Sequence, residues 1–485
     1  LGMNNMSIAS CYPPQLKSIH FWLNVHLIFT GYDYILNSGE CQTKYVFSEV
    51  KMKDIILIGA GGRGDKYATV GKEMEDGFRV VAVAEPIMER RNKIKKMHNI
   101  PDDMCFESWE DIFEKEKFAD VVIIATMDKD HFAPSMAAIE KGYNIMLEKP
   151  MAPNPEECIL IEKAAKEKGV FVLVCFVLRY SSFFTGLKKL IKSGIIGDVI
   201  NIQHAEDVGN IHQSHSFVRG NWGNSEKSSF MLLQKSSHDT DILQWLLDKK
   251  CTRVSSFGST SFFKRENAPE GSPEYCINGC PYSDECFYDA RKIYMETEDE
   301  AHRIWFRTAA TKKAEPTDED VEWALRNTQY GKCVFKCDND VVDHQIVNFE
   351  FEGGVTANFT MSAFNEGTRR ITIMGTKGTI TGDMNENSVI IYSFSDKSKN
   401  KMEITSCLSA SDLTGGHGGG DEGIMHELKA LLDAPKLQTG VSQNSVSGHM
   451  VAFAAEHSRI TGQVVYVNEY IDGIKNLVDK SEFRV

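Results

Sequence analysis

The chain contains 485 residues, of which 42% are hydrophobic and 10% are aromatic, and its formal net charge is -14. At roughly 100–200 residues per domain, this length predicts two or three domains, and the composition argues against wholesale disorder. The acidic charge argues against a nucleic-acid-binding protein, which needs a basic surface, and gives no reason to expect anionic lipid as a partner.

No stretch reaches the roughly 18 consecutive apolar residues of a membrane-spanning helix. The 12 cysteines are not spaced like those of a small secreted disulfide scaffold. We therefore expect a cytoplasmic protein. Residues 1–51 show no clear periodicity, and the first strong strand follows Met52. We interpret them as a poorly structured leader or extension that precedes a natural start at Met52.

Residues 52–175 alternate strands with helices, which predicts a parallel sheet built from βαβ units. The expected strands are 54–58, 79–84, 121–125 and 144–147. Their apolar runs suit strands that are buried on both faces.

The first of these strands leads directly into a glycine-rich loop at residues 59–64, and a helix is expected over 63–74. In this context the spacing indicates a dinucleotide-binding loop. Gly59 permits a tight turn, Gly61 lets the backbone approach a pyrophosphate, and Gly64 allows close packing of helix and strand. Gly62 and Arg63 complete the loop at the helix N-terminus, where free N–H groups bind phosphate.

Glu85 ends the second strand, 21 residues after Gly64. An acidic side chain at this place accepts hydrogen bonds from the adenosine ribose and repels a 2′-phosphate, so we expect NAD rather than NADP. The nearby cations Arg63, Arg90 and Arg91 weaken that preference.

The pattern changes in the second region, residues 176–470, which we expect to form a substrate and oligomerisation domain. Alternating strands at 201–205, 254–263, 345–351, 355–362, 370–375 and 389–392 predict a large, open, mostly antiparallel sheet. The fold class is therefore an α/β Rossmann domain followed by an α+β domain. Residues 264–342 form a cysteine-containing insertion, helices are expected over 422–432 and 442–461, and residues 471–485 form a tail.

Several motifs make this chain similar to the Gfo/Idh/MocA oxidoreductases, the relatives of glucose–fructose oxidoreductase and inositol dehydrogenase. They are the glycine loop, Ala125-Thr126 with His131, Glu148-Lys149-Pro150, and residues 235–241, which begin with Lys235 and contain His238. The resemblance covers residues 52–465 and implies an active site between the Rossmann domain and the open sheet. We expect Ala125, Thr126, His131, Glu148 and Lys149 to contact the cofactor.

Lys149 and His238 are the candidate catalytic residues. Lys149 follows a strand end, at the edge where ligands of open α/β sheets bind, and its charge lowers the pKa of a substrate alcohol. His238 opens a helix over 236–247, and imidazole is a natural base for a hydroxyl proton near neutral pH. In the family the matching histidine contributes to this transfer, and Asp239 and Asp241 are placed to orient it.

One position departs from the family pattern. Inositol dehydrogenase-like members have Asp four residues before the histidine, and this chain has Gln234 there. The familiar Asp–His proton relay is therefore in doubt. We expect the next residue, Lys235, to enter the pocket, as it does in a large subgroup of the family.

Other polar residues in unusual surroundings are candidates for substrate binding. Aromatic faces stack on the C–H surfaces of sugars, while guanidinium groups bind hydroxyls. The candidates are Arg179, Tyr180, His215, Arg219, Trp222, Lys235, Asp241 and His417. The last lies in a glycine-rich segment that is either a substrate lid or a flexible linker.

The insertion contains Cys276, Cys280 and Cys286, with Cys333 47 residues later. Thiolates from two loops suit a structural zinc ion or an iron–sulfur cluster, although this spacing is not that of the strong zinc motifs. Simple reduced cysteines are an equal alternative.

The leading hypothesis is an NAD-dependent dehydrogenase that acts on a ring hydroxyl of a sugar, glycoside or cyclitol. A redox glycosidase that uses NAD catalytically is the second, and a non-catalytic NAD sensor is the third. Apolar residues on both faces of the second sheet, such as Phe349 and Ile346, predict a homo-oligomer, either a dimer or a tetramer.

Overall fold

A computed structural model describes residues 52–75, 77–407, 418–434, 439–441 and 445–480. The predicted leader and the candidate His417 lie outside these ranges. Among the helices that are described, none has the length and apolar character of a membrane-spanning segment.

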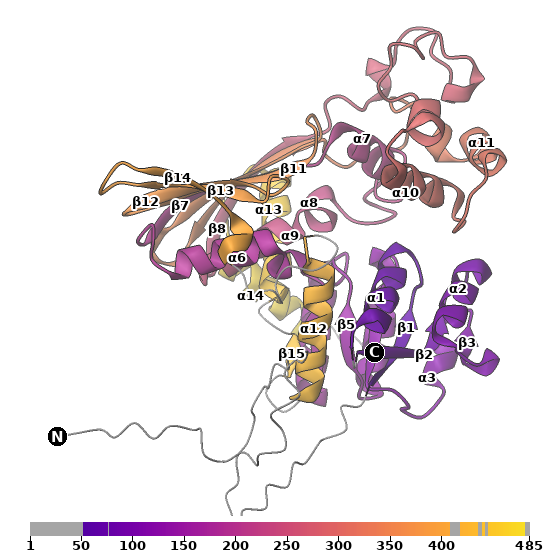
Figure 1. Ribbon diagram of the computed structural model, residues 1–485, viewed down its shortest axis with the longest axis horizontal. Coiled ribbons are helices and arrows are strands. Elements are labelled where there is room, and N and C mark those ends of the chain that lie inside the picture. The colour runs from indigo at the N-terminus through magenta and orange to yellow at the C-terminus, as the bar shows by residue number, and fades with distance from the viewer. Residues whose placement is uncertain (1–51, 76, 408–417, 435–438, 442–444, 481–485) are drawn as a thin grey trace, which may run out of the picture. The chain divides into compact units, whose positions relative to one another are not determined.

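Sheet A is the parallel sheet of the Rossmann domain, and its strand order is β15-β6-β5-β4-β1-β2-β3 (Figure 1). Its strands are β1 (Lys53–Ile58), β2 (Phe78–Ala84), β3 (Cys105–Phe106), β4 (Val121–Ile124), β5 (Asn144–Leu147), β6 (Phe171–Val174) and β15 (Gly440–Val441). Helices α1 (Gly62–Glu73), α2 (Met88–His98), α3 (Glu110–Phe113), α4 (Phe132–Glu140) and α5 (Pro155–Lys168) connect them. The predicted α/β class is confirmed, and all four residues of β4 are buried, as expected for a central parallel strand.

The C-terminal part of the chain returns to the Rossmann domain. Strand β15 extends sheet A beside β6, and helix α12 (Gly420–Asp433) buries Ile424 and Leu428 in the same core as Leu57. The sequence had placed these residues in the second domain. Because their partners are more than 200 residues earlier in the chain, periodicity alone gave no indication of this docking. Helix α14 (Val467–Lys480) likewise crosses the predicted start of the tail at residue 471.

Sheet B has nine strands in the order β14-β13-β12-β11-β7-β10-β9-β8-β16, and only the β7–β10 pair is parallel. The strands are β7 (Val199–Asp207), β8 (Cys251–Ser259), β9 (His344–Phe351), β10 (Thr356–Ser362), β11 (Thr368–Gly375), β12 (Gly378–Asp383), β13 (Ser388–Ser393), β14 (Lys399–Glu403) and β16 (Val465–Tyr466). Helices α6 (Ser182–Lys192), α8 (Met231–Gln234), α9 (Ser237–Leu247), α13 (Ser445–Thr461) and α14 lie on one face (Figure 1). The expected open, mostly antiparallel sheet is confirmed.

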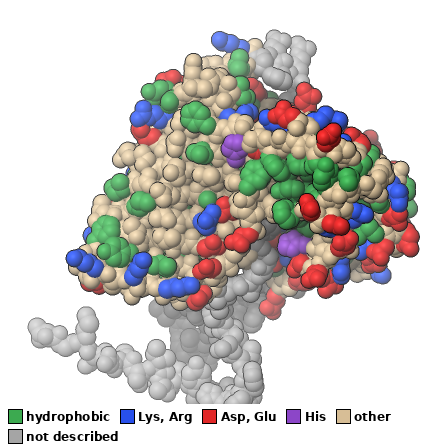
Figure 2. Space-filling view, turned by 90° about the horizontal axis from the view of Figure 1, so that it is seen from above, with side chains coloured by type: hydrophobic (Ala, Val, Ile, Leu, Met, Phe, Trp, Pro, Cys, Tyr) green, Lys and Arg blue, Asp and Glu red, His purple; other side chains and the backbone are tan. Residues whose placement is uncertain are grey.

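The two faces of sheet B differ in character. Along β9, Val347, Phe349 and Phe351 point into the core, and the residues between them face outward. The outward face is rich in uncharged polar side chains, and its exposed hydrophobic exceptions include Phe257 and Ile346 (Figure 2). This face is less apolar than the sequence suggested, and the homo-oligomer stays a prediction.

The insertion between β8 and β9 is more regular than its sequence suggested. It contains helices α10 (Glu300–Thr311) and α11 (Asp318–Asn327), which pack on a core of their own that includes Tyr294 and Leu325. Thr317 and Asp320 form a capping box at the start of α11.

His449 of α13 fixes the backbone that follows Lys149 and Pro150. Its Nε2 accepts a hydrogen bond from the Met151 N–H at 3.0 Å, and its Nδ1 lies 2.8 Å from the Ser445 carbonyl oxygen. An acceptor at Nε2 and a donor at Nδ1 define a neutral ring. Burial lowers the pKa of His449 to about 4, and the positive charge of Lys149 adds to the effect.

We expect His449 to make the folded state sensitive to mild acid. In the unfolded chain this imidazole takes up a proton near pH 6.5, whereas the folded protein resists protonation until about pH 4. Its contribution to stability is therefore complete above pH 6.5 and is lost as the pH falls, by about 1.4 kcal/mol per pH unit. Urea unfolding of the parent and of His449→Gln at pH 7.5 and 5.5 will measure it.

The parent should lose about 1.4 kcal/mol more unfolding free energy between these two pH values than His449→Gln loses. Other buried histidines, such as His215, contribute equally to both proteins and cancel in the difference. Equal losses in the two proteins would contradict the assignment.

Candidate active site

The glycine loop between β1 and α1 has the geometry of a phosphate-binding turn. Gly59 has φ +86°, and a Cβ on it would lie 2.6 Å from the Ala125 carbonyl oxygen. A Cβ on Gly64 would lie 2.0 Å from the Gly59 oxygen, whereas one on Gly62 would meet no atom within 4 Å. The loop is thus packed tightly against the backbone at Gly59 and Gly64 and is open at Gly62, where the first N–H groups of α1 can bind a pyrophosphate.

Glu85 at the end of β2 is buried and holds the glycine loop. Its Oε2 accepts from the Ala60 N–H at 2.7 Å, and its Oε1 accepts from the Ile87 N–H at 3.0 Å. Each carboxylate oxygen has a further lone pair, which fits the hydroxyls of an adenosine ribose. Of the nearby cations, Arg91 is bonded to the Glu85 carbonyl and to Glu107, while Arg90 lies beside Gly61.

The side chain of Glu148, at the end of β5, links this strand end to α1 and, through Arg63, to α12. Glu148 Oε1 accepts from Arg63 Nε at 2.8 Å and from the Tyr67 hydroxyl at 2.6 Å, and its Oε2 accepts from the Lys149 N–H at 2.9 Å. Arg63 also pairs with Asp421 of α12 at 2.7 Å. The Arg63 and Glu148 side chains, predicted to contact the cofactor, are bonded to one another and to α12, and so they position the site.

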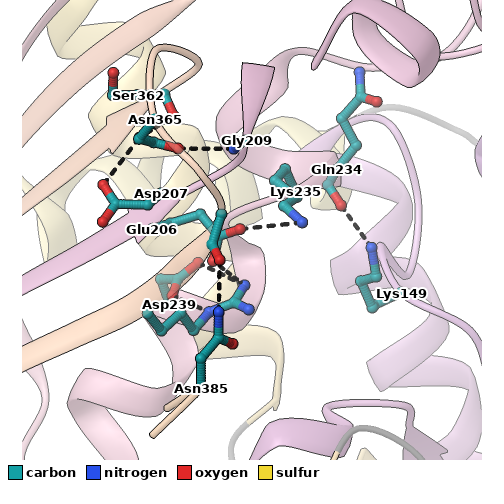
Figure 3. A network of polar contacts seen from close by, with 12 residues as sticks. Lys149, Glu206, Asp207, Gly209, Gln234, Lys235, Asp239, Ser362, Asn365 and Asn385 are labelled. Atoms are coloured by element: carbon teal, nitrogen blue, oxygen red, sulfur yellow. Dashed lines mark hydrogen bonds and ion pairs between the residues drawn. The ribbon is translucent and has the colours of Figure 1, made fainter. Parts of the chain in front are cut away.

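Lys149 reaches from the end of β5 to the second domain. Its Nζ donates to the Gln234 carbonyl oxygen at 2.6 Å, four residues before His238 (Figure 3). Burial lowers the pKa of Lys149, and Lys235 adds to the lowering, although Glu148 and Asp128 oppose it. A lowered pKa makes the ammonium more able to exchange a proton near neutral pH.

Lys235 enters the same region but is held differently. Its Nζ lies 3.0 Å from Glu206 Oε1, and Glu206 Oε2 lies 2.5 Å from Arg369 of β11 (Figure 3). Arg369 also pairs with Asp239, which accepts a hydrogen bond from His204 at 2.8 Å. Sequence reasoning missed Glu206 and Arg369, because their pairing across β7 and β11 joins segments that are far apart in the chain and no local pattern indicates it.

His238 lies in the first turn of α9, half-buried, and its ring centroid is 5.8 Å from that of Phe176, in an edge-to-face arrangement. The predicted role of the flanking carboxylates in orienting it is wrong. Asp239 is bonded to Arg369 and His204, which outweigh the effect of burial and lower its pKa to about 2. Asp241 forms a two-bond ion pair with Arg179, with Arg179 Nε at 2.6 Å from Oδ2.

The Gln234 side chain offers no substitute for the missing Asp of the relay. Its amide nitrogen donates to the carbonyl oxygens of Trp222, at 3.2 Å, and of Ser229. Figure 3 shows this side chain extending away from Lys149. Only the backbone of Gln234 meets the lysine.

Several predicted substrate contacts are buried in packing instead. Arg219 is completely buried and donates to the carbonyl oxygens of Lys332 and Tyr288, at 2.8 and 2.6 Å. His215 bonds to the Tyr294 hydroxyl at 2.8 Å, and burial lowers its pKa to about 3. Both side chains are bonded to residues of the insertion, whose packing could not be inferred from the sequence. Arg219 and His215 therefore hold the insertion in place, whereas the sequence had predicted that they contact a sugar.

The remaining candidates lie at the borders of the site. Arg179 and Asp241 are buried as a pair, and Tyr180 packs against Gly423 of α12. Trp222 is half-buried and donates to Asp128 at 3.3 Å. His131, which was predicted to contact the cofactor, is buried between the Pro150 oxygen at 2.6 Å and the Thr126 oxygen at 3.3 Å, where it joins the loops after β4 and β5.

The four candidate metal ligands line one pocket of the insertion, and they are Cys276, Cys280, Cys286 and Cys333. Within the described ranges, however, no three His, Cys, Asp or Glu side chains are arranged to hold a metal ion. Burial raises the pKa of the Cys286 and Cys333 thiols, and Arg219 only partly opposes it. The structure does not support the predicted metal site, and the four cysteines are free thiols, of which Cys276 and Cys333 are buried.

His212 is a candidate that the sequence did not indicate. It ends the short helix α7 (Asn210–His212), which follows β7, the strand that carries Glu206. Burial lowers its pKa well below the usual value, and the positive charges of Lys235 and Arg369 contribute. A neutral imidazole therefore faces the region of Lys235.

Comparisons with known proteins agree with this arrangement. Residues 53–176 match the oxidoreductase family model with an NAD-binding Rossmann fold, and residues 184–381 match the GFO/IDH/MocA C-terminal domain model. A solved structure of levoglucosan dehydrogenase in complex with NADH and L-sorbose superposes with a TM-score of 0.61, covering 86% of this chain and 99% of that chain. At 17% identity, this likeness concerns the fold.

Three curated proteins are similar in sequence to this chain over different fractions of its length. The protein named "Putative oxidoreductase YteT" of Bacillus subtilis (strain 168) is 25% identical over 70% of this chain and 78% of its own length. Inositol 2-dehydrogenase 4 of Saccharopolyspora erythraea is 27% identical, over 44% of this chain and 59% of its own length. The 2,7-anhydro-N-acetylneuraminate hydratase of Mediterraneibacter gnavus is 28% identical, over 42% of this chain and 51% of its own length.

The two family models together cover well over half of the chain, in the order and at the places of sheet A and sheet B. The chain belongs to the Gfo/Idh/MocA family of oxidoreductases, and its first domain is an NAD-binding Rossmann fold.

Proposed function

We propose that this protein transfers a hydride between NAD and a ring hydroxyl of a sugar, glycoside or cyclitol. The observation that carries the proposal is the bond of 2.6 Å from Lys149 Nζ to the Gln234 carbonyl. It joins the cofactor domain to the segment that carries Lys235 and His238, so three groups that bind or move protons lie at one edge of sheet A. Ligands of open α/β sheets bind at this edge.

The residues fit a nicotinamide dinucleotide. The glycine loop is open in front of the α1 N-terminus, and Glu85 is placed for the adenosine ribose. When bound, the nicotinamide supplies the hydride acceptor. The protein then binds the substrate, excludes water and removes the hydroxyl proton.

Lys149 and His238 are the proposed proton acceptors. Lys149 has a lowered pKa and is hydrogen-bonded to a neutral carbonyl. Lys235 is ion-paired with Glu206, and we assign it to binding a substrate oxygen. Tyr180 and Trp222 lie at the borders of this region and are proposed to contact the substrate.

The second candidate is a redox glycosidase, and the similarity to 2,7-anhydro-N-acetylneuraminate hydratases favours it. In this reaction a hydroxyl is oxidised to a ketone, which acidifies the neighbouring C–H. The glycosidic substituent then leaves by elimination, water adds, and the ketone is reduced again. The same base and the same cofactor serve both schemes.

A screen of hexoses, p-nitrophenyl glycosides and inositols with NAD tests the function. We expect turnover of at least one ring polyol because the site combines a cofactor loop with proton acceptors. Stoichiometric NADH formation identifies a dehydrogenase, and p-nitrophenol release with substoichiometric NAD identifies a glycosidase. Neither signal from any compound would contradict both candidates.

We expect NAD to bind at least about tenfold more tightly than NADP, because a 2′-phosphate would be forced against the Glu85 carboxylate. Calorimetry on the cofactor-free protein measures both dissociation constants. The Glu85→Gln variant should narrow the difference, since it removes the negative charge. NADP binding as tight as that of NAD would disprove the preference and leave the fold assignment intact.

Lys149→Ala and His238→Ala should each lower kcat by about 10²–10⁴-fold, which is the usual contribution of general acid–base catalysis. Dissociation constants for NAD should change little, because the glycine loop and Glu85 are untouched. Lys141→Ala, at the exposed end of α4, is the matched control and should keep the parent kcat. A near-normal kcat in either active-site variant would exclude that residue as proton acceptor.

A further inference from the structure

Trp305 of helix α10 packs against three other aromatic or imidazole rings and is still partly exposed. Its ring centroid lies 5.0 Å from that of His212, 5.2 Å from that of His215 and 5.0 Å from that of Phe306. In spite of these contacts its side chain is 38% exposed. The exposed part of this ring is available to a ligand.

His212 connects Trp305 to the catalytic region. It ends α7, which lies beside α10 and begins just after β7 (Figure 1). Close to the start of α7, the Gly209 N–H donates to Asn365 at 2.8 Å, and Asn365 donates to Asp207, next to the Glu206 that holds Lys235 (Figure 3). These bonds fix the position of α7 against the strands that support Lys235.

The half-buried His212 ring packs against Trp305 and Phe217, and it makes no hydrogen bond with the part of the chain that the structure describes. The charged or titratable groups around it are Lys235, Arg369, His215 and His302. Burial and the positive charges of Lys235 and Arg369 keep the imidazole neutral, with one donor and one acceptor nitrogen. Such a ring is suited to bind a hydroxyl group.

A partly exposed indole next to a half-buried imidazole is a combination that can bind a pyranose ring. Sugar C–H faces pack on aromatic rings, and the hydroxyls at the ring edge find hydrogen-bond partners. Since α7 follows the strand whose Glu206 pairs with Lys235, a substrate that extends from Lys235 along α7 would meet His212 and Trp305.

We propose that Trp305 and His212 form a subsite for a second ring, so that the natural substrate is a glycoside rather than a free monosaccharide or cyclitol. This inference rests on the proposed oxidation of a ring hydroxyl at Lys149 and His238. The insertion is then the element that sets substrate size, since it supplies the stacking surface.

The test compares Trp305→Ala, Trp305→Phe and Trp323→Ala in the full-length chain. Trp323 is the matched control, because it lies on α11 of the same insertion and is 63% exposed. Calorimetry with NAD present, in a His238→Ala background that prevents turnover, measures binding of a p-nitrophenyl glycoside and of its free hexose. The hexose is the one that gives the strongest signal in the activity screen.

The parent and Trp323→Ala should bind the p-nitrophenyl glycoside about five- to tenfold more tightly than the free hexose, in line with one aromatic stacking contact. Trp305→Ala should lose this preference with hexose affinity unchanged, and Trp305→Phe should keep most of it. A preference that survives in Trp305→Ala, or its absence in the parent, overturns the subsite while the proposed function stands. If no sugar gives a signal in the screen, the proposed function fails and the subsite fails with it.

Discussion

The buried carboxylate of Glu148 is the constraint on which the catalytic arrangement depends. One side chain accepts hydrogen bonds from Arg63 and Tyr67 of α1 and from the backbone N–H of Lys149. Burial alone would raise the pKa of Glu148, but Arg63 and Lys149 outweigh it and keep the carboxylate charged. Because a buried charge without partners is costly, the glycine loop, the end of β5 and α12 must stay together. The position of Lys149 thus follows from the same interaction that fixes the phosphate loop.

A second set of buried charges positions the other side of the site. Glu206, Arg369 and Asp239 lie on the inner side of sheet B and in α9, where most neighbours are apolar. Each of these charged side chains is paired with one of opposite charge, as burial requires. Lys235 is the outermost member of the network, and it pairs with Glu206. The inward charges of sheet B therefore hold Lys235, which follows the Gln234 carbonyl that Lys149 contacts.

The sequence predicted the features that depend on local pattern. The glycine loop, Glu85, the parallel strands and the alternation of β9 and β10 are each encoded within short segments, and the structure has them. Features that depend on pairing across the chain were not predictable. The insertion encloses Arg219, which the sequence predicted to bind a sugar. The docking of α12 on sheet A joins segments more than 300 residues apart. Asp239 was next to His238 in sequence, yet α9 turns it toward Arg369.

The contrast between the two lysines bears on which of them accepts a proton. Lys235 is bonded to a carboxylate, and removing its proton would leave the Glu206 charge to Arg369 alone. Lys149 is bonded to the neutral Gln234 carbonyl, so its side chain can lose the charge without stranding an acceptor of opposite charge at its Nζ. A positive neighbour such as Lys235 also favours the neutral form of Lys149 through Coulombic repulsion. These contacts support the proposed division of roles, in which Lys235 is the fixed cation that attracts a substrate oxygen and Lys149 is the group that exchanges its proton.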